Sequence, residues 1–99
     1  YSRLIEITLK HADKKVVQAA ADTYVDQLKT SLKGIKIMGP GEPMISKIRN
    51  EYLMLALLKI RRDQGKLNSI KTTLQQIASE LQQVKEYRSV KIVFDVDPA

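Results

Sequence analysis

The sequence predicts an α+β fold: a ferredoxin-like two-layer sandwich in which a four-stranded antiparallel sheet carries two helices on one face. Apolar and polar residues alternate near both ends of the chain, which is the period of a strand. Two longer stretches have apolar residues every three or four positions, which is the period of an amphipathic helix. The order of these patterns is β-α-β-β-α-β, and 99 residues suffice for one two-layer core. We therefore expect a single domain over residues 1–99.

The first half is predicted to hold a strand, a long helix and a short second strand. Residues 2–9 alternate as a half-buried strand does. From about residue 12 to residue 33 the spacing is helical, and Gly34 follows as a left-handed stop. A short run at 35–38 precedes GPGEP at 39–43, whose two glycines and two prolines predict a hairpin loop. The predicted core positions are Ile5, Ile7, Leu9, Val17, Ala20, Tyr24, Leu28 and Leu32.

The second half is predicted to hold a long strand, the second helix and a final strand. Residues 44–60 have apolar residues of one parity and indicate a strand, although their Leu, Met and Ala content also fits a helix. Asp63 can cap the next helix. A coiled-coil seam is the alternative for that helix, but fewer than three heptads favour packing on a sheet. Residues 90–96 alternate again. The predicted core positions are Leu67, Ile70, Leu74, Ile77, Leu81, Val84, Val90, Ile92, Phe94 and Val96.

The face of the sheet away from the helices is predicted to be apolar. In the strand at 44–60 the outward parity contains Leu53, Leu55 and Leu57, with Lys59 next. Exposed apolar patches usually mark interaction surfaces. We therefore expect the three leucines to dock on another protein surface.

Charge and residue inventory restrict the function. Seventeen Lys and Arg against 11 Asp and Glu give a net charge of +6 and a pI near 9.7, which favours a polyanionic partner such as nucleic acid or an acidic peptide. Without cysteine and with one histidine, His11, the chain cannot build thiolate or multi-histidine sites. No apolar run approaches the ~20 residues that cross a bilayer. We expect a soluble binding domain with no catalytic residues, cofactor, metal or membrane contact of its own.

Three features that resemble chemical sites are interpreted as structural. Asp95 and Asp97 share one face of a strand, as two ligands of a hard cation would, but no third ligand is near in sequence. We expect Asp97 to end the strand by bonding neighbouring backbone, and Asp95 to pair with a base across the sheet. The stretch MGPGEP lacks the spacing of a phosphate-binding loop. His11 is expected at the surface, in the first turn of the first helix.

The strongest candidate site is the stretch KIRRDQGKLNSIK at 59–71. Five basic side chains and one acidic one give it a net charge of +4, at the start of a helix whose free N–H groups favour an anion. Gln64 and Asn68, four residues apart, can add amide donors on one face. A solvated charged corner is the alternative. The residues predicted to bind DNA or an acidic tail are Lys59, Arg61, Arg62, Gln64, Lys66, Asn68 and Lys71.

Two segments resemble a known family. The run IKIMGPGEPMISKIRNEYLMLALLK, followed by a helix and then VKIVFDVDPA, is similar to the C-terminal domain of primosomal protein N′ (PriA), a family of bacterial replication-restart helicases. That family has a GP-x-x-P turn, a strand R-x-x-Y-R-W-x-L-L-L and an ending V-x-I-x-x-D-V-D-P. Its Y-x-R-L start matches Tyr1, Arg3 and Leu4, so the resemblance covers the whole chain. Where the family has Tyr-Arg-Trp, this chain has Tyr52, Leu53 and Met54.

The resemblance implies a non-catalytic piece of a 3′-to-5′ DNA helicase, with ATP, magnesium and zinc bound by other parts of the parent protein. It implies a cytoplasmic, nucleoid-associated protein whose partners are branched DNA, the acidic C-terminal tail of single-stranded DNA-binding protein, and the rest of the helicase. For the tail the family uses side chains at the start of the second helix. These match Arg62, Gln64, Lys66 and Asn68, and because a family arginine falls on Gln64, Arg61, Arg62 or Lys66 must supply the charge.

Two other functions remain as hypotheses. The first is a purely structural domain that docks or oligomerises through the apolar sheet face and has no affinity for DNA. The second is a small metal-dependent enzyme that uses Asp95 and Asp97.

Overall fold

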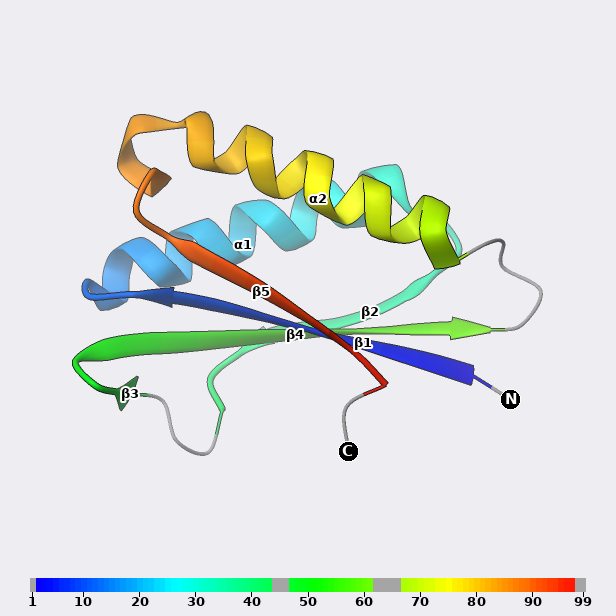
Figure 1. The fold of residues 1–99 in the computed structure, drawn as a ribbon, viewed down its shortest axis with the longest axis horizontal. Coiled ribbons are helices and arrows are strands. Elements are labelled where there is room, and N and C mark those ends of the chain that lie inside the picture. Colours follow the sequence, from blue (N-terminus) through cyan, green and yellow to red (C-terminus); the bar gives the residue numbers. More distant parts are fainter. Residues whose placement is uncertain (1, 44–46, 62–66, 98–99) are drawn as a thin grey trace.

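The computed structural model describes residues 2–43, 47–61 and 67–97 and confirms the predicted ferredoxin-like arrangement (Figure 1). A five-stranded antiparallel sheet carries two long helices on one face, and the strands β2, β4, β1 and β5 lie side by side in that order. A two-residue strand, β3, pairs with β4 and adds the fifth strand to the four expected. In chain order the elements are β1 (Ser2–His11), α1 (Lys14–Ser31), β2 (Lys36–Gly41), β3 (Lys47–Ile48), β4 (Glu51–Arg61), α2 (Leu67–Gln83), a 3-10 turn η1 (Lys85–Tyr87) and β5 (Lys91–Val96).

The core lies between the sheet and the two helices. Ile5, Ile7 and Leu9 on the central strand β1 are fully buried, as their alternation predicts. Tyr24 of α1 is also fully buried, and its hydroxyl donates a hydrogen bond of 2.9 Å to the Leu74 carbonyl of α2. Burial without a charge partner raises the pKa of the Tyr24 phenol, so it stays a neutral donor. This bond ties the helices together where they meet the sheet.

The predicted strand at 44–60 is interrupted by a tight turn. Lys47–Ile48 and Glu51 onwards form two antiparallel strands, with Ile48 opposite Glu51. Arg49 and Asn50 between them have φ of 51° and 65°. Two consecutive residues with positive φ fit the right-handed twist of a two-residue hairpin. The apolar pattern did not predict this turn, because the turn contains no glycine. The helix alternative for this stretch is wrong, since residues 51–61 form β4.

The predicted hairpin loop at 39–43 is partly strand. Residues up to Gly41 belong to β2, which stays paired with β4 through a register shift between Met38 and Gly41. Gly39 allows this because its φ is 105°, and a Cβ there would lie 2.9 Å from the carbonyl oxygen of Leu55. The glycine is therefore required by the close approach of two strands as well as by its own backbone conformation.

The first helix starts two residues later than predicted. Asp13 is its N-cap, and its Oδ1 accepts from the N–H groups of Lys15 and Val16 at 2.9 and 3.4 Å. His11 is the last residue of β1 and not part of the helix, contrary to the prediction. Its Nδ1 accepts a hydrogen bond of 2.9 Å from the Asp13 N–H, which shapes the tight strand-to-helix connection.

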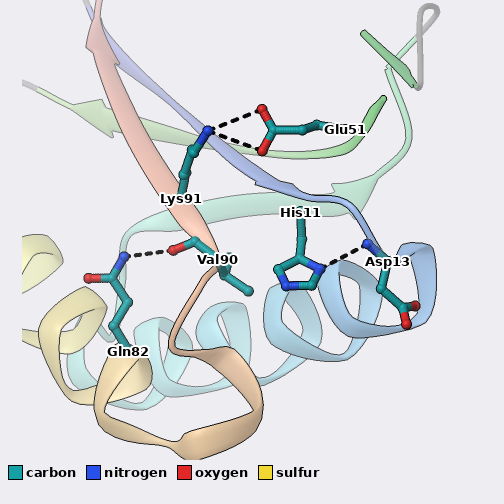
Figure 2. A network of polar contacts seen from close by, with 6 residues as sticks. All are labelled: His11, Asp13, Glu51, Gln82, Val90 and Lys91. Atoms are coloured by element: carbon teal, nitrogen blue, oxygen red, sulfur yellow. Dashed lines mark hydrogen bonds and ion pairs between the residues drawn. The ribbon is translucent and has the colours of Figure 1, made fainter. Parts of the chain in front are cut away.

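The second helix ends before Val84, which the spacing had placed in the core. Val84 precedes the 3-10 turn and is 44% exposed, whereas Leu81 is 1% exposed. Gln82 closes this corner by donating a hydrogen bond of 2.7 Å to the Val90 carbonyl, as Figure 2 shows. The predicted cap, Asp63, lies outside the described residues. Neither described helix is both long and apolar enough to span a bilayer.

Candidate polyanion-binding site

The start of β2, the end of β4 and the start of α2 meet at one end of the molecule (Figure 1). The register places Lys36 of β2 directly opposite Lys59 of β4, and both side chains are exposed. Like charges directly opposite each other on a sheet repel. An anion held between the two ammonium groups would relieve this repulsion. We name the set Lys36, Lys59 and Lys71 the basic end.

No residue of the basic end is neutralised within the described part of the chain. The ion pairs among the described residues join Arg3 to Asp97 at 2.8 Å, Lys14 to Glu42 at 3.4 Å and Lys91 to Glu51 at 3.3 Å. None of these pairs involves the three lysines of the basic end. Their positive potential is therefore directed at solvent, where it can attract a polyanion.

The helix that borders this end exposes further polar groups. Asn68 and Lys71 lie in the first two turns of α2 and are exposed, and the Asn68 carbonyl accepts a hydrogen bond of 2.9 Å from Thr72 Oγ1. Arg61, at the end of β4, is exposed as well. The other three predicted site residues, Arg62, Gln64 and Lys66, lie outside the described residues. The structure therefore brings Lys59, Arg61, Asn68 and Lys71 to the same end and adds Lys36, which the sequence analysis missed.

The terminal acidic motif closes the sheet. The Asp97 N–H donates to the Leu4 carbonyl at 2.6 Å, and the Asp97 carboxylate accepts from the Leu4 N–H at 3.0 Å and from Arg3 Nε at 2.8 Å. The backbone bond from Leu4, and then the bond and charge of Arg3, lower the pKa of Asp97 below its ordinary value. Asp97 therefore binds backbone as predicted. Among residues 2–43, 47–61 and 67–97, no cluster of three His, Asp or Glu side chains could hold a metal ion.

The prediction for Asp95 is wrong. Its cross-strand neighbour on β1 is Glu6, an acid, and no ion pair of Asp95 occurs among the described residues. Two carboxylates therefore lie directly opposite each other, one on the central strand β1 and one on the edge strand β5. The register that creates this pair could not be read from the sequence.

The other face of the sheet, which we name the open face, carries the predicted leucines. Leu55 and Leu57 are half-buried, while Leu53 is already 92% covered, with 8% of its surface exposed. A shallow hollow of about 260 Å³ lies between β2 and β4, with Glu6 at its border. Figure 2 shows Lys91 reaching from β5 to both carboxylate oxygens of Glu51. The open face thus combines apolar side chains with charged ones.

The geometry defines a ferredoxin-like α+β domain with both long helices on one sheet face and a basic end that no described side chain neutralises. Its family follows from the sequence: the model of the primosomal protein N C-terminal domain matches residues 1–99, so the chain belongs to that family. This confirms the resemblance and makes the chain a domain of a replication-restart protein. No individual curated protein matches it in sequence.

Solved structures confirm the fold. A de novo designed protein, Foldit4, is similar with a TM-score of 0.70 at 9% identity, over 100% of this chain and 99% of that chain. A hydantoinase/carbamoylase family amidase from Burkholderia ambifaria has a TM-score of 0.54 at 12% identity, over 96% and 27% of the two chains. A second designed protein, LFR1 1 with ferredoxin fold, has a TM-score of 0.50 at 14% identity, over 99% and 86%. At these identities the likeness concerns the fold alone.

Proposed function

We propose that this domain binds branched DNA for a replication-restart helicase and docks the acidic C-terminal tail of single-stranded DNA-binding protein. The observation that carries the proposal is the basic end, where three lysines lie exposed without an ion pair among the described residues. Family membership supplies the setting. The domain acts by holding its partners, and the chemistry of ATP hydrolysis, with its magnesium, and the zinc site belong to other parts of the parent protein.

The DNA contact is made to the phosphate backbone. Lysines at fixed spacing bind phosphate oxygens without reading base edges. A single-strand binding site would also need exposed aromatic rings on which bases stack. Of the aromatic residues that the structure describes, Tyr24 is buried, and Tyr52, Tyr87 and Phe94 are half-buried. The domain therefore recognises charge and shape, which suits a helicase that acts at forks of any sequence.

The acidic tail docks at the start of α2. A peptide carboxylate and its acidic neighbours need cationic and amide donors close together, and charge-assisted bonds of this kind are the stronger hydrogen bonds in proteins. Asn68 and Lys71 are exposed there, and Arg61 is exposed at the end of β4. The family resemblance adds Arg62, Gln64 and Lys66 to this set. Tail and DNA would then compete for overlapping charges.

Fluorescence anisotropy with a forked DNA tests the DNA contact. Lys71→Gln should weaken binding and make the slope of log K against log salt shallower by about 1, because one phosphate fewer is neutralised. Lys85→Gln is the matched control, because Lys85 is exposed in η1, beyond the far end of a 17-residue helix. The part of the helix from Lys71 to Gln83 separates the two lysines by roughly 18 Å. Equal effects of the two substitutions would show that binding follows net charge and not the basic end.

The tail contact is tested with a short acidic peptide that has a free C-terminal carboxylate. Arg61→Glu together with Lys71→Glu should weaken this peptide by about 1–3 kcal/mol for each charge-assisted bond that the variant removes. A peptide with an amidated C-terminus is the control for the carboxylate. Unchanged affinity in the double variant would assign the tail to another surface.

A further inference from the structure

The open face has an internal symmetry in its charges. Thr8 of β1 lies in direct register with Leu55 of β4 and with Val93 of β5, and we name these three residues the central row. On one side of the central row lie Glu6 and Asp95, directly opposite each other. A strand repeats every two residues, so the side chains two and four positions from the central row, in either direction, point to the same face of the sheet. They can therefore be compared across this row.

On β1, β4 and β5, each charge on one side of the central row is matched by an opposite charge at the same distance on the other side. β2 ends at this row, so Lys36 has no counterpart on its own strand. On β1, two residues from Thr8 in either direction stand Glu6 and Lys10. On β5, two residues from Val93 stand Asp95 and Lys91. On β4, four residues from Leu55 stand Lys59 and Glu51, and two residues from it stand Leu57 and Leu53.

This pattern is what a two-fold axis requires. If the axis runs along the central row, a second copy laid face to face on the first keeps every strand over its own counterpart and reverses its direction. Each charge of β1, β4 and β5 then faces its opposite. We propose that the occupant of the open face is a second copy of this chain, in a symmetric dimer with the two sheets packed as an aligned sandwich. The facing charged pairs are Glu6 with Lys10, Asp95 with Lys91 and Lys59 with Glu51, and Leu55 and Thr8 face themselves. Leu53 is already covered within one copy and adds little to the contact.

Two properties of the single copy support this occupant. Glu6, Asp95 and Lys10 have no ion pair among the described residues, although the two acids repel each other across the sheet. In the dimer each of these acids meets a lysine. The exposed apolar side chains of the face, Met38 at 36% and Val93 at 48%, would be covered as well.

The size of the face predicts a weak dimer. The four strands have 10, 11, 6 and 6 residues, and at ~3.3 Å per residue and ~4.8 Å between strands they give a face of roughly 500 Å² per copy. The total of roughly 1,000 Å² is below the range of stable specific complexes, so association is expected only at micromolar or higher concentrations. The dimer uses Lys59, which also belongs to the basic end, but it does not depend on DNA or peptide binding.

Sedimentation equilibrium on the 99-residue chain, from micromolar to millimolar concentration, tests the proposal. The wild type should associate as a dimer. Glu6→Lys and Lys10→Glu should each weaken the dimer more than tenfold, because like charges then face each other. Mixing these two variants should restore it, since every charge on β1 again faces its opposite only in the mixed pair. Leu55→Asp should abolish association, because the two aspartates would meet on the axis.

The controls carry the same charge changes on the helical side. Glu80→Lys and Lys29→Glu lie on exposed positions of α2 and α1, and both should dimerise as the wild type does. Circular dichroism melts confirm that each variant is folded. A wild type that stays monomeric at millimolar concentration, as it would if another protein surface covers this face, overturns the proposal. Single variants that dimerise normally, or a mixture that does not associate, overturn it too.

Discussion

Three glycine-to-alanine substitutions separate the two reasons why a glycine is needed at the join between β2 and β4. Gly39 has a φ of 105° and would place a Cβ 2.9 Å from the Leu55 carbonyl oxygen and 3.3 Å from Ala56 Cα. Gly34 has a φ of 89° but open space around it. Gly41 has neither a positive φ nor a close neighbour. From Gly41 to Gly34 to Gly39, the series therefore adds first the positive φ and then the close contact with β4.

The expected changes in the free energy of unfolding follow from these environments. An L-residue at positive φ costs about 1–2 kcal/mol, and contact with backbone that cannot move away costs about 1–3 kcal/mol. Alanine also recovers about 0.4–1 kcal/mol by restricting the unfolded chain. Gly39→Ala should therefore destabilise by about 1–4.5 kcal/mol and Gly34→Ala by about 0–1.5 kcal/mol. Gly41→Ala should be neutral or stabilise by up to about 1 kcal/mol.

Urea unfolding monitored by circular dichroism measures all three variants at constant m-value. The thermal midpoint gives a second readout, since 1 kcal/mol corresponds to about 4–8 °C for a domain of this size. If Gly39→Ala is no more destabilising than Gly34→Ala, the close approach of β2 to β4 does not contribute, and the account of the GP turn is refuted.

Three further predictions concern the core, the C-terminus and the end of α2. Tyr24→Phe should cost about 0.5–1.5 kcal/mol in urea unfolding, because it removes only the hydrogen bond to the Leu74 carbonyl; no loss would mean that the bond contributes nothing. Asp97→Asn should destabilise the domain above about pH 4, where the unfolded carboxyl is ionised. Since the folded pKa is lowered, this difference from the wild type should shrink as the pH falls through the folded pKa, and a pH-independent difference would contradict it. Val84→Asp should leave the thermal midpoint nearly unchanged, whereas Leu81→Asp should unfold the domain. Equal effects would mean that Val84 is buried in a longer helix, as its spacing predicted.

Periodicity predicted the elements, their order and nearly all of the core, because the side chains that each helix or strand buries follow the period of that element. It failed where single residues decide the backbone. Arg49 and Asn50 make a turn without glycine or proline, and Gly39 keeps a strand paired through what looked like a loop. Val84 was assigned to the core because its spacing continues the helical stripe. Spacing alone does not show where a helix ends.

The candidate site was predicted only in part, because the sequence shows neighbours along the chain but not neighbours across the sheet. The run at 59–71 made Lys59, Arg61, Asn68 and Lys71 visible because they are neighbours in sequence. Lys36 was missed because its relation to Lys59 is a matter of strand register, which joins residues 23 positions apart. Asp95 was misread for the same reason, since its partner across the sheet is fixed only when β1 and β5 are paired.

The salt dependence of forked-DNA binding by the wild-type domain tests the central claim most directly. Three lysines without an ion pair among residues 2–43, 47–61 and 67–97, each displacing one counterion, predict a slope of log K against log salt of about −3, or steeper if neighbouring residues add contacts. A slope near zero, or no measurable binding at low salt, would contradict the claim that the basic end is a polyanion-binding site.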